Sequence, residues 1–141
     1  MSPHRAYLDD QALIAEVHRL AGSERSSTVE LVARLAELDE RRLYLNKGYP
    51  SLFAYCRTEL KLGEAEAFNR IEAARAVRHH PELLEKLADG SLCLSTLGIV
   101  APHLDEDETL LEAASDKTRR EVEELVAARL PEQPAVFSVR K

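Results

Sequence analysis

The stretch LKLGEAEAFNRIEAARAVRHH, from Leu60 to His80, decides how the chain is interpreted. A short turn around Gly63 leads into a segment rich in Ala, Glu and Arg, which are strong helix formers. Its apolar residues recur at helical spacing, which predicts a helix over residues 64–78. The inward face of that helix is expected to comprise Ala67, Phe68, Ile71 and Ala74. Because a helix over about 51–60 should precede the turn, the whole unit has the proportions of a helix-turn-helix.

Polar side chains on the predicted helix 64–78 allow two interpretations. Asn69 lies opposite the apolar face with Arg70 near it, and Asn and Arg are residues that read base edges in DNA. However, Glu64 and Glu66 occupy the first turn, where they would repel phosphates, and Glu66 stands four residues before Arg70, ready for an ion pair within the helix. The helix could therefore face DNA, or it could be one amphipathic helix of a scaffold.

Helical periodicity dominates the rest of the chain. Gly22 and the following Ser/Thr cluster should separate a first helix from a second, which would start with a capping box at residues 27–30. The sequence NKGYPS at 46–51 is the clearest break, and the helix after it should turn Leu52, Phe53, Cys56 and Leu60 inward. The predicted helices cover about 10–21, 27–43, 51–60, 64–78, 81–89, 95–101, 106–114 and 118–130. We therefore expect an all-α compact bundle of about eight mostly short helices over residues 1–130, with a helix-turn-helix-like core at about 51–101 and a linker or tail at 131–141.

Composition and charge limit the function classes. A chain of 141 residues is long enough for one domain with a sizeable core. The net charge is −6, but residues 104–132 hold 10 Asp/Glu and only 4 Lys/Arg, so the body is close to neutral. A local basic patch is therefore possible without being required. With acids at Asp9 and Asp10 in place of a signal-peptide core, and no apolar run of roughly 20 residues, we expect a cytoplasmic protein with no membrane partner.

Catalytic and metal-binding constellations are not evident in the sequence. The five histidines are scattered, and the adjacent pair His79-His80 would point about 100° apart on a helix. The acidic run at 105–108 is expected at a helix N-terminus, where acids complement the helix dipole. Cys56 and Cys93 lie in apolar contexts and are predicted to be buried free thiols. We expect no cofactor, no metal and no catalytic residues in this chain.

The segment GYPSLFAYCRTELKLGEAEAFNRIEAARAVRHHPELLEKLADGSLCLSTLGIVAPHL, residues 48–104, resembles the helical N-terminal domain that precedes the nuclease module in a family of bacterial HNH endonuclease proteins. The likeness covers about 30–131, and SVRK at 138–141 resembles the start of the linker to the nuclease. The same core is similar, more loosely, to the helix-turn-helix domain of ParB/KorB-type partition proteins.

This resemblance implies a module that binds or positions duplex DNA. Base readout would fall on Asn69, Arg70 and Arg75, and backbone contacts on Arg57, Lys61 and Arg78. The HNH motif itself is missing, so this chain is not expected to cut DNA.

A second class of function rests on the first helix. Leu13, Ile14, Val17 and Leu20 form an apolar stripe at helical spacing. Soluble monomers usually avoid an exposed patch of this kind, so we expect the stripe to be buried within the domain or against a second copy. The alternative function is thus a protein-interaction or homodimerisation module without direct nucleic-acid binding.

Overall fold

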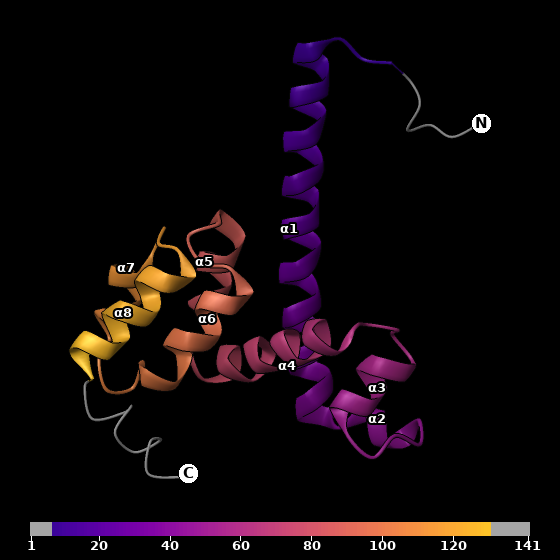
Figure 1. Ribbon diagram of the computed structural model, residues 1–141. Coiled ribbons are helices and arrows are strands. Elements are labelled where there is room, and N and C mark those ends of the chain that lie inside the picture. Colours follow the sequence, from indigo (N-terminus) through magenta and orange to yellow (C-terminus); the bar gives the residue numbers. More distant parts are fainter. Residues whose placement is uncertain (1–6, 131–141) are drawn as a thin grey trace.

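The computed structural model describes residues 7–130, and these form helices joined by short turns with no strand among them (Figure 1). The all-α prediction is confirmed, and most helices are short. The elements are α1 (Asp10–Arg41), α2 (Leu43–Asn46), α3 (Leu52–Thr58), α4 (Glu64–His79), α5 (Leu83–Asp89), α6 (Leu94–Val100), the 3-10 helix η2 (Ala101–His103), α7 (Leu110–Ala114) and α8 (Arg119–Arg129). The predicted tail at 131–141 lies outside the described residues.

The first two predicted helices are in fact one continuous helix, α1. The prediction of a break at Gly22 was wrong because one glycine inside a helix costs only about 1 kcal/mol, which neighbouring helix formers offset. Asp9 caps the true N-terminus, its carboxylate accepting a hydrogen bond of 2.8 Å from the Ala12 N–H. The helix ends where Arg42 adopts a left-handed conformation with φ 54°.

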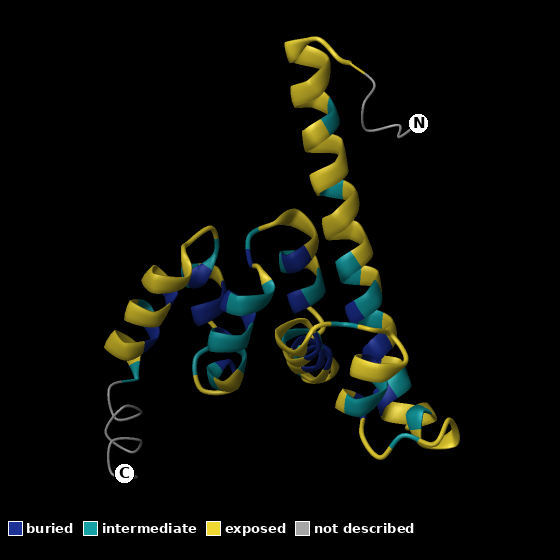
Figure 2. Cartoon of the chain, turned by 45° about the vertical axis from the view of Figure 1, so that its right-hand side comes forward, coloured by how far each residue is buried: buried dark blue, intermediate teal, exposed yellow. Residues whose placement is uncertain are grey.

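The two halves of α1 differ in burial (Figure 2). Its C-terminal half packs into the molecule through one face, which carries Val32, Leu35, Ala36 and Asp39. By contrast, residues 10–20 project beyond the other helices, and only Glu16 among them is even partly buried. We call residues 10–20 the arm.

The central helix of the body is α4, which contacts α1, α3, α5 and α6. Its bounds agree with the prediction, and Gly63 precedes it as expected. Glu66 reaches back over the first turn and accepts a hydrogen bond of 2.8 Å from the Gly63 N–H. The buried side chains of α4 form one broad face: Ala67, Ile71, Ala73, Ala74 and Val77.

The remaining helices pack beyond α4, away from α2 and α3 (Figure 1). Gly90 ends α5 with φ 85°, and the Thr118 hydroxyl caps α8 by accepting from the Glu121 N–H at 3.1 Å. Asp107, from the acidic run, pairs with Arg129 of α8 at 2.9 Å and also accepts from the Thr109 N–H at 3.1 Å. Asp107 therefore ties the segment that precedes α7 to α8.

Candidate interaction surfaces

Two of the side chains predicted to contact DNA are joined to α1 instead. Arg75 donates to both carboxylate oxygens of Asp39, with Nε–Oδ2 at 3.1 Å and Nη2–Oδ1 at 3.4 Å. Arg78 donates to Asp39 Oδ2 at 3.4 Å. The Asp39 side chain is only 7% exposed, so its charge needs these partners. Both arginines thereby hold α4 against α1.

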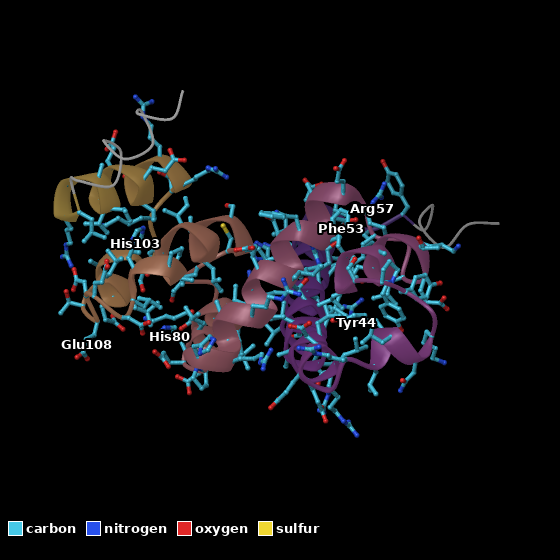
Figure 3. The ribbon with its side chains drawn as sticks, turned by 90° about the horizontal axis from the view of Figure 1, so that it is seen from below. Tyr44, Phe53, Arg57, His80, His103 and Glu108 are labelled. Carbon is cyan, nitrogen blue, oxygen red and sulfur yellow. The ribbon has the colours of Figure 1, made fainter. Side chains whose placement is uncertain are left out.

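The other predicted DNA contacts lie on α3, on α4 and in the turn between them. Asn69 and Arg70 are half-buried, and the Arg70 guanidinium donates to the Glu66 carbonyl at 3.3 Å. Arg57 is exposed on α3 and donates to the Leu62 carbonyl at 3.0 Å. Lys61 is exposed in the connecting turn with φ 60°. In Figure 3, Arg57 and Phe53 lie at one end of the molecule, with His80 and His103 at the other.

The solvent face of α4 differs from that of a basic recognition helix. Its exposed residues include three acids as well as two arginines: Glu64, Ala65, Glu66, Phe68, Glu72, Arg75, Arg78 and His79. Phe68 was predicted to point inward but is 57% exposed, because α1 and α6 bury the helix on other sides. Phe53 and Leu60 were also predicted to point inward, yet both are exposed, whereas Leu52 and Cys56 are buried as expected.

The apolar stripe of the arm is uncovered by the described part of the chain. Leu13, Ile14, Val17 and Leu20 are 51%, 58%, 55% and 50% exposed. Steps of three or four residues lead from this stripe through residues 24, 28 and 31 to Leu35, which is buried. The stripe therefore continues the face by which α1 packs into the body.

A cleft of about 510 Å³ opens where the arm meets the body, between α1, α4 and the connection from α5 to α6. Arg25 and Arg70 line it together with Glu24, and Leu87, Leu92 and Val29 form its apolar part. The Arg25 side chain lies across Gly90, where a Cβ would meet its Nε at 3.5 Å. The guanidinium therefore lies within van der Waals reach of Gly90 at the edge of the cleft.

Cys93 also lines this cleft and is exposed, so the prediction of a buried thiol was wrong for Cys93 and right for Cys56. Burial would raise the pKa of the Cys93 thiol, but hydrogen bonds from Ser95 and Thr96 outweigh it and lower the pKa to about 7. The Ser95 hydroxyl lies 3.3 Å from the sulfur. The misprediction arose because Cys93 is the N-cap of α6 and not part of its inward face.

The roles of two residues at these surfaces were not predicted, although the sequence contains an indication of each. Asp39 follows Val32, Leu35 and Ala36 at helical spacing, so it is a lone acid on an apolar face. Such an acid calls for a cationic partner from another element. Arg25 lies on the same side of α1, and only the continuity of the helix through Gly22 reveals that position.

No family model, curated protein or solved structure matches this chain. Membership of the HNH endonuclease family therefore stays a prediction. Within residues 7–130, no group of three His, Cys, Asp or Glu side chains is arranged to hold a metal ion. None of the helices described here has the length and apolarity needed to cross a bilayer.

Proposed function

We propose that this domain is a self-association module in which the arm of α1 pairs with a second copy of the chain. The observation that carries the proposal is the exposure of Leu13, Ile14, Val17 and Leu20 on a helix that projects from the body. A two-helix seam needs apolar residues at spacings of three and four, which Leu13, Val17 and Leu20 supply. A second copy offers an identical stripe and needs no further component.

The energy available from the arm is modest. Full burial of one such aliphatic side chain contributes about 1.5–3 kcal/mol. A side chain that is half-exposed in the monomer can therefore contribute about half of that free energy when a partner covers it. Eight side chains in a dimer then contribute roughly 6–12 kcal/mol before the cost of association, about 4–15 kcal/mol, is subtracted. The stripe alone thus gives a weak dimer, and tight pairing requires contacts beyond it.

DNA binding receives less support from the geometry. Arg75 and Arg78 share the carboxylate of Asp39, and Arg70 is directed to the cleft at the base of the arm. Of the predicted phosphate contacts this leaves Arg57 and Lys61 as exposed side chains that form no ion pair within residues 7–130. Glu64 and Glu66 remain beside them at the start of α4. DNA binding by this domain stays a prediction.

Sedimentation velocity of the purified chain over a range of concentrations tests the proposal. We expect the average mass to rise from monomer towards dimer, and the double variant Leu13→Glu/Val17→Glu to stay monomeric with unchanged helicity. Ala15→Glu is the matched control, because Ala15 is exposed on the opposite side of the arm and should leave association intact. A wild-type chain that stays monomeric at every concentration would exclude self-association through the arm.

A further inference from the structure

Two arms can pair in parallel or antiparallel orientation, and the charges at their ends distinguish the two. The N-terminal end carries Asp9 and Asp10, whereas the next turn of α1 beyond the arm carries Glu24 and Arg25. Parallel pairing would bring each acid beside the same acid of the partner chain and align the two helix dipoles, and both arrangements are repulsive. Antiparallel pairing brings Asp9 of one copy towards Arg25 of the other and sets the helix dipoles in opposite directions, and it places the two bodies at opposite ends.

The apolar residues set the register of an antiparallel pair. With Val17 at the two-fold axis, Ile14 packs on Leu20 and Leu13 packs on Ala21, so every stripe residue meets an apolar partner. The same register brings Asp9 to the level of the partner's Arg25 and Asp10 to the level of the partner's Glu24, so Asp9 forms the attractive pair. Each residue advances a helix by 1.5 Å, so Leu8 then lies just beyond Arg25, at the mouth of the cleft.

The cleft has the chemistry to receive this N-terminal turn. Arg25 and Arg70 bring two positive charges to the cleft, whose lining includes Glu24, and Asp89 lies within electrostatic reach of Arg25. Neither arginine forms a salt bridge within residues 7–130. The apolar floor suits Leu8, which is exposed ahead of α1. The stripe also leads directly towards this cleft, since it continues the face of α1 that packs into the body.

On the basis of the proposed self-association, we infer that the dimer is antiparallel and that the N-terminal turn of each copy, residues 7–10, docks in the partner's cleft. Asp9 pairs there with the partner's Arg25, while Leu8 contacts the apolar floor. These contacts supply the additional affinity that the stripe lacks. The cleft is thus a binding site for a second copy of this chain.

Disulfide trapping tests the docking, because the cleft already contains the thiol of Cys93. In Leu8→Cys, diamide should take two electrons and two protons from the introduced thiol and the partner's Cys93, giving a covalent dimer that Cys93→Ser abolishes. Cys56 is fully buried and should not take part. In the Cys93→Ser background, Leu13→Cys should cross-link only if the arms are parallel, whereas Val17→Cys should cross-link in either orientation.

The outcomes separate this inference from the proposed function. A chain that sediments as a dimer and cross-links through Val17→Cys, but not from Leu8→Cys to Cys93, keeps self-association and overturns docking in the cleft. Cross-linking through Leu13→Cys overturns the antiparallel orientation. A chain that is monomeric throughout overturns both proposals.

A charge cycle tests the pairing of Asp9 with Arg25. Asp9→Asn removes the charge but keeps a good helix cap, and Arg25→Gln removes the opposite charge. Each should weaken dimerisation by about three- to tenfold, since two equivalent pairs are lost, and the double variant should be no weaker than either single one. Additive effects in the double variant would show that the two side chains do not meet.

Discussion

Asp39 and Arg75, on different helices and far apart in sequence, form a two-pronged ion pair that joins α1 to α4. The Asp39 carboxylate is nearly buried, and Arg78 donates a third hydrogen bond to it. The pair gives two arginines of the predicted DNA-binding helix a structural role. It also fixes the two longest helices against each other at the end of α1 opposite to the arm (Figure 1).

Asp39→Asn should lower the stability of the fold. The substitution keeps the shape of the side chain but leaves two guanidinium groups without their counter-charge. Both arginines are partly solvated, so we expect a loss of roughly 1–2 kcal/mol in the free energy of unfolding, measured by urea denaturation. Glu37→Gln is the control, because Glu37 pairs with Arg34 and Arg41 on the surface of the same helix and should change stability by less than about 0.5 kcal/mol. Equal effects of the two substitutions would contradict the role of Asp39.

Arg75 should behave differently from Arg57 and Lys61 in a duplex-binding assay. If DNA binds, the available phosphate contacts are Arg57 and Lys61, which gives a slope of log K against log salt of about −2. Arg57→Ala/Lys61→Ala should then reduce this slope by about 2, while Arg75→Ala should lower stability and leave the slope unchanged. Fluorescence anisotropy at several salt concentrations measures the slopes. The absence of binding by the wild-type chain at low salt would exclude the DNA-binding prediction for this domain.

Local rules of sequence were sufficient for most helix boundaries. The break before Ser51, the bounds of α4 and the cap at Thr118 follow from glycine, proline and hydroxyl positions, and the structure has all of them. The length of α1 was not predictable in this way. Glycine often marks the end of a helix, but the free-energy cost of Gly22 inside α1 is small compared with the stability that the other residues give to so long a helix.

Contacts between distant segments decided the parts that sequence did not predict. Which side of α4 faces solvent depends on how α1 and α6 cover it, so the exposure of Phe68 had no local signal. The pairing of Asp39 with Arg75 and Arg78 likewise required two helices to be placed together. For the apolar stripe, sequence left open whether it is buried within the domain or against a second copy. The projection of the arm shows that residues 7–130 of the same chain do not cover it.

Two glycine substitutions should shift stability in opposite directions. Gly22 lies inside α1 with nothing near its would-be Cβ, so Gly22→Ala should stabilise the helix by about 0.5–1 kcal/mol. Gly48 is equally uncrowded but has φ 89°, so Gly48→Ala should be destabilising by about 1 kcal/mol or more. Thermal unfolding and helicity by circular dichroism measure both. A decrease in helicity with Gly22→Ala would contradict the continuous α1.

Cys93 should react with iodoacetamide at lower pH than an ordinary cysteine. The thiolate is the nucleophile, so the rate should rise with pH to a midpoint at about 7, the pKa of Cys93, whereas a free thiol has its midpoint near 8.5. Ser95→Ala removes the hydroxyl 3.3 Å from the sulfur and should move the midpoint upward. Cys93→Ser should abolish the reaction of the folded chain, because Cys56 is fully buried. A wild-type midpoint near 8.5, unchanged in Ser95→Ala, would show that these hydrogen bonds do not stabilise the thiolate.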